Sequence, residues 1–228
     1  MTDRQLVPTP HGDARLVRDR SRRPIATLLL GHGAGGGVDA PDLAALAAAL
    51  PRHGISVVRV EQPWRVAGGR IALRPQVLDE CFVAAANRLR VRTPLVVGGR
   101  SAGARSAART ARELGASGVV ALAFPLHPPG RPERSRLAEI EGVNLPTLVV
   151  QGEKDAFGRP EEFPPDRDLA VVPGADHRFR VPKRGLVSAE EAMAIIVEAV
   201  LEFVVREVVG ASAPQGGNRT PFGRVGRG

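Results

Sequence analysis

The chain has one cysteine, no tyrosine and no apolar run of transmembrane length among its 228 residues. The single cysteine, Cys81, excludes an internal disulfide and a metal cluster built from cysteines. The first nine residues also lack the charged-then-apolar layout of a signal peptide. We therefore predict a cytoplasmic protein that does not bind a membrane and needs neither a metal ion nor an organic cofactor.

Lysine is almost as scarce, because the formal net charge of +8 comes from arginine and lysine occurs only at Lys154 and Lys183. The arginines are scattered over the whole chain with acidic residues between them. No cluster combines aromatic and basic side chains into a platform for stacked bases. The sequence therefore predicts no specific nucleic-acid partner, and its charge predicts only a non-specific attraction to polyanions.

The length is sufficient for one domain with a substantial buried core. Short apolar runs at residues 5–7 and 14–17 predict a hairpin at the edge of a sheet. Beyond it, strand-like and helix-like runs alternate, which predicts an α/β fold with a mostly parallel central sheet and helices on both faces. We assign residues 1–210 to this domain and predict that residues 211–228, which are rich in glycine and polar residues, form a disordered tail.

Apolar periodicity and capping residues indicate where several helices lie. The expected helices are residues 41–50 with Asp39 as a cap, residues 75–90 with Cys81 on the apolar face, and a last helix opened by the capping pair Ser188 and Glu191. Two proline-rich segments, residues 128–142 and 156–166, are too short for a large lid. A shallow and open site is expected from their length.

Residues 99–103 read Gly-Arg-Ser-Ala-Gly, follow the apolar run 94–97 and precede an alanine-rich run of helix formers. A Gly-x-Ser-x-Gly turn between a strand and a helix lifts the serine hydroxyl above the sheet edge, and it needs small residues because the two backbones nearly touch. Ser101 is therefore a candidate nucleophile, and the N–H of Ala102 is a candidate oxyanion donor. Alone, the motif also fits a glycine-rich turn without a chemical role.

Two further polar residues follow the next strand-like runs. Asp155 comes after the run 146–151, and His177 comes after the run 168–172. A carboxylate just past the end of one strand can orient an imidazole that follows its neighbour at the same sheet edge. The chain order of serine, acid and histidine is the order found in α/β-hydrolases.

Each of these assignments has an alternative. Asp155 also fits a solvated turn residue, in which case Glu153 or Asp176 would be the acid. His177 also fits a surface histidine, and His127 competes with it as the base. We prefer His177 because the base belongs after the last strand and downstream of the acid.

A glycine-rich loop, Gly-His-Gly-Ala-Gly-Gly-Gly at residues 31–37, directly follows the apolar run 25–30. Such a loop after an early strand supplies the second oxyanion N–H in this architecture, and Ala34 is the candidate donor. The loop is not a P-loop, because no Gly-Lys-Ser/Thr follows it. Dinucleotide binding is disfavoured as well, because no acidic partner for a ribose stands at the expected spacing.

Together these motifs make the chain resemble the α/β-hydrolases. More narrowly, it resembles a small hydrolase-like group that includes the testis-expressed hydrolase-like protein of animals and the hydrolase-like subunit of the NSL histone acetyltransferase complex. The residues that carry the resemblance are 31–37, 98–103, 124–130, 151–155 and 174–177. The resemblance covers roughly residues 5–206 and implies a hydrolase fold. It implies no particular substrate, and the chromatin-associated members suggest that some relatives have scaffolding roles. Some relatives of the dienelactone-hydrolase type use a cysteine nucleophile, but here the central residue of the Gly-x-Ser-x-Gly turn is Ser101.

The few aromatic and histidine side chains near predicted strand ends are candidate pocket residues. They are His32, Trp64, Phe124, His127, Phe157 and Phe179. Packing of loops onto the sheet is the alternative for the aromatics, and a structural role is the alternative for His127. Arg100 and Arg105 flank the serine, and we expect them to be solvated or paired rather than to contact a substrate.

The sequence thus predicts a serine hydrolase that acts on a small ester, thioester or amide as a monomer or homodimer. Its triad would be Ser101, Asp155 and His177, and it would form an acyl-enzyme. Two rivals remain on the same fold: a non-catalytic interaction or scaffold protein, and an enzyme of acyl transfer or perhydrolysis.

Overall fold

A single eight-stranded sheet organises the chain, with the strand order β1-β2-β4-β3-β5-β6-β7-β8. The computed structural model describes residues 2–210, so the tail predicted at residues 211–228 lies outside the described residues. The strands are β1 (Thr2–Thr9), β2 (Gly12–Asp19), β3 (Ala26–Gly31), β4 (Ile55–Glu61), β5 (Leu95–Arg100), β6 (Gly118–Leu122), β7 (Thr147–Gly152) and β8 (Asp168–Val172).

The N-terminal hairpin is the antiparallel part of the sheet. Strand β1 pairs with β2, and β2 pairs with β4, both in antiparallel register. All other neighbours, from β4 through β3 to β8, are parallel. The predicted edge hairpin is confirmed, and its strands are longer than the apolar runs that indicated it, because the exposed outer half of β1 carries polar side chains.

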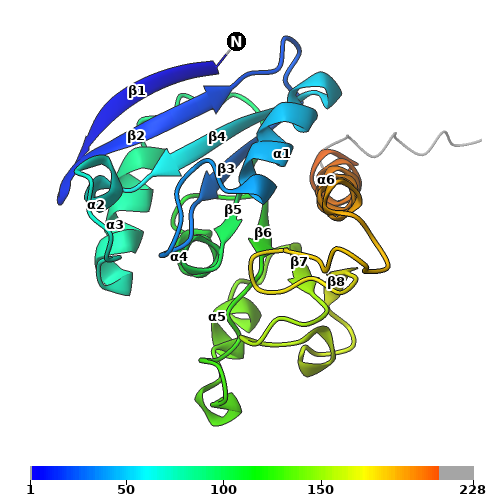
Figure 1. Cartoon of the computed structure of the whole chain (residues 1–228). Coiled ribbons are helices and arrows are strands. Elements are labelled where there is room, and N and C mark those ends of the chain that lie inside the picture. Colours follow the sequence, from blue (N-terminus) through cyan, green and yellow to red (C-terminus); the bar gives the residue numbers. More distant parts are fainter. Residues whose placement is uncertain (1, 211–228) are drawn as a thin grey trace, which may run out of the picture.

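Helices cover both faces of the sheet (Figure 1). The longer helices are α1 (Pro41–Ala49), α3 (Pro75–Ala86), α4 (Ala102–Thr110) and α6 (Ala189–Phe203). The short ones are α2 (Pro63–Val66), α5 (Leu137–Glu141), 3-10 turns at Leu50–His53, Pro132–Arg134 and Pro160–Glu162, and a π-helical end at Val204–Val209. Helices α1 and α6 pack on one face, and α3 and α4 pack on the other. The predicted α/β architecture is therefore confirmed.

The two cores follow from the alternation of side chains along each central strand. Leu28 and Leu30 of β3 pack in the core under α1 and α6, whereas Leu29 between them packs in the core under α3 and α4. All three side chains are fully buried. Each such leucine contributes about 1.5–3 kcal/mol through its burial. Continuous apolar runs are typical of strands that are covered on both sides.

The helix boundaries correct two of the sequence-based expectations. Ala40, not Asp39, is the N-cap of α1, and no side chain caps this helix. Asp39 is largely exposed instead and lies 3.8 Å from the guanidinium of Arg59. Helix α3 ends at Ala86, four residues before the expected end. The capping box of Ser188 and Glu191 at the start of α6 is confirmed.

The backbones of β3 and α4 lie in direct contact beside the turn that follows β5. A Cβ added to Gly103 would clash with the carbonyl groups of Gly31 and His32, and a Cβ added to Gly99 would lie 2.5 Å from the Gly31 oxygen. Only glycine tolerates this approach. The close contact places the end of β3, where the glycine-rich loop begins, against the first turn of α4.

We expect Gly103→Ala to lower the free energy of unfolding by about 1–3 kcal/mol, because the added methyl group has no space and must push two backbones apart. Denaturant unfolding measures the loss. Gly36→Ala is the matched control, because a Cβ at Gly36 meets no heavy atom within 4 Å. Equal stability of the two variants would contradict the packing described here.

Candidate active site

Ser101 stands in the sharp turn between β5 and α4, with φ 51° and ψ −111°. A non-glycine residue with positive φ is strained by about 1–3 kcal/mol and persists only where its surroundings hold it. Here the Ser101 N–H donates to the carbonyl oxygen of Leu122 at 2.9 Å, and its own carbonyl accepts from Arg105 N–H at 3.1 Å. These hydrogen bonds hold the strained serine at the carboxyl edge of the sheet.

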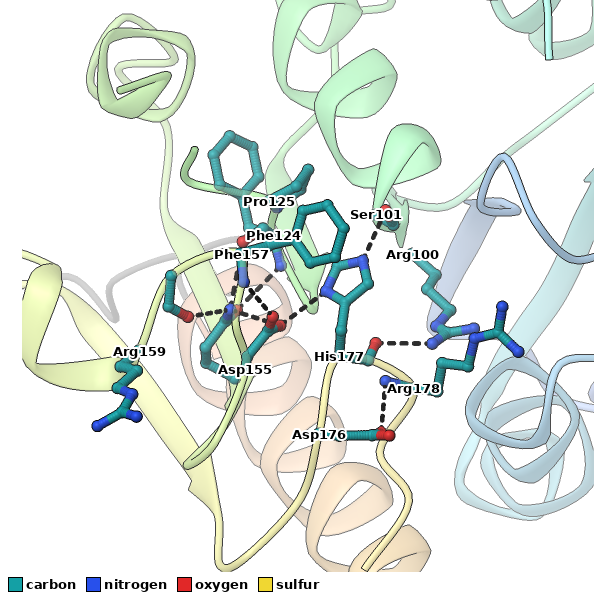
Figure 2. Close-up of polar contacts among 12 residues, drawn as sticks. Arg100, Ser101, Phe124, Pro125, Asp155, Phe157, Arg159, Asp176, His177 and Arg178 are labelled. Carbon is teal, nitrogen blue, oxygen red and sulfur yellow. Dashed lines mark hydrogen bonds and ion pairs between the residues drawn. The ribbon is translucent and has the colours of Figure 1, made fainter. Parts of the chain in front are cut away.

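His177 connects this serine to a buried carboxylate (Figure 2). Its Nε2 lies 3.0 Å from the Ser101 hydroxyl oxygen, and its Nδ1 lies 2.8 Å from Oδ2 of Asp155. The serine follows β5, the aspartate follows β7 and the histidine follows β8, so three strand ends bring the groups together. The structure thus joins the three residues that the sequence grouped.

The two alternative acids lie outside this chain of hydrogen bonds. The Glu153 carboxylate accepts the backbone N–H of Gly174. The Asp176 carboxylate accepts the backbone N–H groups of Arg178 and Arg180, at 2.7 and 2.9 Å. Each therefore shapes its own loop and does not orient the imidazole.

Gln151, to which the sequence analysis gave no role, holds the aspartate loop. Its side chain is fully buried, and its amide nitrogen donates to Asp155 Oδ2 at 2.9 Å and to the Gly158 carbonyl at 2.7 Å. Its amide oxygen accepts the N–H of Phe124 at 2.9 Å. The second oxygen of Asp155 accepts the N–H of Phe157 at 2.8 Å. The sequence did contain one signal for this role. Gln151 ends an otherwise apolar strand, and a buried side-chain amide needs hydrogen-bond partners.

Arg100, the residue before Ser101, anchors the loop that carries His177. Its guanidinium donates to the His177 carbonyl at 2.7 Å, and its Nε lies 3.4 Å from the carboxylate of Asp42 in α1. Asp42 is 1% exposed, and burial raises the pKa of its carboxyl while the Arg100 charge opposes that rise. The expectation that Arg100 is paired is met, and so is that for Arg105, which binds Glu139 through two hydrogen bonds.

His32 supports the glycine-rich loop from below. Its Nε2 accepts the backbone N–H of Gln62 at 3.1 Å, so the imidazole proton resides on Nδ1, which donates to the carbonyl of Gly33 at 2.9 Å. Burial lowers the pKa of His32, which keeps the ring neutral. His32 thus fixes the direction of the loop that carries Ala34.

The two candidate oxyanion donors have no competing acceptor in the described part of the chain. Ala102 is the first residue of α4, where an N–H has no partner within the helix. Ala34 lies in the turn closed by the hydrogen bond from Gly36 N–H to the Gly33 carbonyl. Ala102 directly follows Ser101, and Ala34 lines the same cleft as Ser101.

An open cleft of about 710 Å³ leads to the serine. Its lining includes the glycine-rich loop with Ala34, the pair Ser101 and His177, and Phe157, whose ring stacks on the imidazole at a centroid distance of 4.1 Å. A much smaller cavity lies behind Ala34 and Ala102 and is lined by His32 and Trp64, which the sequence analysis had placed in the pocket.

The structure corrects the prediction for the other three expected pocket residues, which do not line the cleft. Phe124 is buried in a third apolar cluster, with Ala121 of β6 and Val149 of β7. Phe179, in the loop after β8, is buried in the core under α1 and α6. His127 is 6% exposed and bonds to the carbonyl of Pro128 and the carboxylate of Glu162, both outside the cleft. Those bonds raise the pKa of His127 and tie together the two short segments after β6 and β7.

We expect Gln151→Leu to destabilise the fold, because the buried N–H of Phe124 then loses its acceptor at a cost of about 1–3 kcal/mol. Asp155 loses a donor in the same variant. Denaturant unfolding measures the change, and Gln76→Leu, the same substitution at an exposed position of α3, is the control. Stability equal to that of this control would contradict a buried amide network.

We also predict that His32 stays neutral, with its proton on Nδ1, at pH values where an ordinary histidine of pKa about 6.5 is half protonated. Nitrogen NMR of the native protein tests this directly. Because the unfolded chain binds this proton and the native chain does not, His32 lowers the free energy of unfolding as the pH falls below about 6.5. A His32 that titrates at or above that pH would contradict the burial and the hydrogen bonds described.

Within residues 2–210, no group of three histidine, cysteine or acidic side chains is arranged to hold a metal ion. No helix in this part of the chain is long and apolar enough to cross a membrane.

Comparisons with known proteins agree with this fold. In solved structures, the fold is similar to a serine hydrolase of Xanthomonas campestris described as lacking a lid, at 20% identity and a TM-score of 0.71, over 90% of this chain and 94% of that chain. It is also similar to a serine hydrolase homologue of Coxiella burnetii, at 20% identity and a TM-score of 0.67, over 87% of this chain and 97% of that chain. A dienelactone hydrolase of Anabaena variabilis is similar at 18% identity and a TM-score of 0.68, over 91% of this chain and 98% of that chain. The model of the alpha/beta hydrolase domain family matches residues 24–205, so the chain belongs to that family.

Proposed function

We propose that the protein is a serine hydrolase that cleaves a small ester, thioester or amide through an acyl-enzyme. The observation that carries the proposal is the continuous hydrogen-bonded series from Asp155 through His177 to Ser101, with distances of 2.8 and 3.0 Å. Membership of the alpha/beta hydrolase family supports a hydrolase in general. A carboxylesterase type of activity is the more specific part of the proposal.

The first chemical step follows from the roles of the donor and acceptor atoms. Asp155 accepts at Nδ1 of His177, so the imidazole proton resides there and Nε2 is free to accept the Ser101 proton. As the serine oxygen attacks the carbonyl carbon, the imidazole becomes an imidazolium. The buried carboxylate stabilises that positive charge and keeps the ring in place.

The tetrahedral oxyanion then lies between the N–H groups of Ala102 and Ala34. Each such donor contributes about 3 kcal/mol to lowering the barrier, because it is aligned before charge develops. The imidazolium gives its proton to the leaving alcohol, thiol or amine as the carbon–heteroatom bond breaks. A water molecule then attacks the acyl-enzyme while His177 takes its proton. His177 returns that proton to the Ser101 oxygen as the acyl–oxygen bond breaks and the acid leaves.

The shape of the site supports small, accessible substrates. The cleft is open to solvent. The segment of residues 128–142 contributes no residue to its lining, and the segment of residues 156–166 contributes only Ala156 and Phe157. Because water reaches the serine freely, hydrolysis is favoured over transfer of the acyl group to another acceptor. The narrower resemblance to the testis-expressed and NSL-associated proteins stays a prediction.

We expect a fluorophosphonate probe to label the wild-type protein at Ser101, and we expect Ser101→Ala and His177→Ala to abolish labelling, because one lacks the nucleophile and the other its base. Gel fluorescence and mass spectrometry locate the label. Circular dichroism verifies that both variants stay folded. Absence of labelling in folded wild-type protein would overturn the hydrolase proposal and favour a scaffold role.

A further inference from the structure

The cleft that leads to Ser101 has an excess of positive charge that the catalytic residues do not use. Its lining includes Lys154, Arg178 and Arg180, and the one acidic side chain among the lining residues is Asp176. All three cations are exposed at the mouth of the cleft, and none of them has an ion-pair or side-chain hydrogen-bond partner among residues 2–210.

Other exposed arginines, such as Arg92 and Arg112, also lack a side-chain partner among residues 2–210, whereas several arginines pair with a carboxylate of another element. Examples of these pairs are Arg15–Glu61, Arg59–Asp19, Arg105–Glu139, Arg109–Asp79 and Arg206–Asp168. The lack of a partner is thus common among the arginines of this chain, and the cleft cations differ from the other unpaired arginines because they line a concave site together with Ser101. Unpaired cations around a concave site raise the local concentration of anions there.

Asp176 forms no ion pair with these cations. Its carboxylate Oδ1 accepts the backbone N–H groups of both Arg178 and Arg180, which holds the loop after β8 in shape, and its single negative charge leaves the three cations in excess. Arg100 is paired separately, with Asp42 at 3.4 Å. The remaining positive charge at the cleft thus belongs to the three side chains at its mouth.

Arg178 is placed to contact a bound molecule directly. It follows His177 in sequence, and its Nη2 lies 3.8 Å from the position that a Cβ on Gly35 would occupy. The side chain therefore reaches from the histidine loop to the glycine-rich loop. In Figure 2 the side chains of Arg178 and Arg100 extend to the same side of His177. A planar guanidinium with free N–H donors binds a carboxylate through two parallel hydrogen bonds.

We propose that the substrate is an acyl compound that carries a carboxylate, and that Arg178 binds this group while Lys154 and Arg180 attract it. The inference rests on the proposed hydrolase function and names its substrate class. The carboxylate does not react. The Ser101 oxygen still forms the bond to the scissile carbonyl carbon, and the leaving group still takes its proton from His177. The contact between the carboxylate and Arg178 binds the substrate and orients its scissile carbonyl.

Two matched pairs of esters test the proposal. Mono-4-nitrophenyl glutarate and 4-nitrophenyl valerate share a leaving group and differ in an acyl-side carboxylate. The second pair, 3-acetoxybenzoate and phenyl acetate, differs in a carboxylate on the leaving group. We expect wild-type kcat/KM, corrected for spontaneous hydrolysis, to be higher for the charged member of at least one pair. Added salt should reduce the preference, because the cations at the cleft mouth are exposed.

Arg178→Gln should lower kcat/KM for the preferred anionic ester roughly 10- to 100-fold, the range expected for losing hydrogen bonds to a charged group. It should also bring the ratio within that pair towards one, and Arg178→Glu should invert it. The matched control is Arg92→Gln, which removes the same charge from an exposed residue just before β5, at the opposite edge of the sheet from Ser101. The control should keep the wild-type preference.

The outcomes separate this inference from the proposed function. Wild-type protein that is labelled by the fluorophosphonate and hydrolyses neutral esters at least as well as both anionic ones would overturn the carboxylate proposal and leave the hydrolase intact. A preference that survives in both Arg178 variants would overturn the role of Arg178. Wild-type protein that neither labels nor hydrolyses any of the four esters would overturn both proposals.

Discussion

The site depends on one close backbone contact, between the end of β3 and the first turn of α4. It exists because residues 31, 99 and 103 are glycines that leave no side chain between the two segments. The contact brings the glycine-rich loop after β3 beside the strained turn of Ser101, whose φ is 51°. A strained residue persists when its surroundings fix it. Ser101 and both candidate oxyanion N–H groups therefore lie on the same pair of adjoining backbone segments.

Polar contacts hold the other two residues of the proposed triad, Asp155 and His177, beside Ser101. The loops after β7 and β8 are joined by the hydrogen bond from Lys154 N–H to the Ala175 carbonyl at 2.9 Å. Gln151 holds the Asp155 carboxylate, and Arg100 holds the main chain of His177. Buried polar groups of this kind are costly when any one partner is lost, so they specify a single arrangement of the loops. That arrangement keeps the imidazole between serine and carboxylate.

Charge is distributed differently in the interior and at the cleft. Inside, Arg100 and Asp42 form a pair that is nearly excluded from water, in which each charge compensates the burial of the other. At the cleft mouth, Arg178 and its two basic neighbours face solvent without carboxylate partners among the described residues. The interior pair serves the geometry of the site, and the exposed cations are available to a ligand. This difference is the physical basis of the substrate class proposed above.

The sequence by itself determined the α/β architecture, because apolar strand runs alternate with helix-forming runs, and it grouped Ser101, Asp155 and His177, because parallel strands bring their carboxyl ends to one edge. It missed the roles of Gln151 and Asp42, whose partners come from distant elements. It also misplaced Phe124, Phe179 and His127, which follow strand ends yet pack inward or bind a neighbouring loop. Position in the chain decides which edge of the sheet a residue reaches. Only tertiary packing decides whether its side chain faces the cleft or the core, because that direction depends on loop conformation and on contacts far apart in sequence.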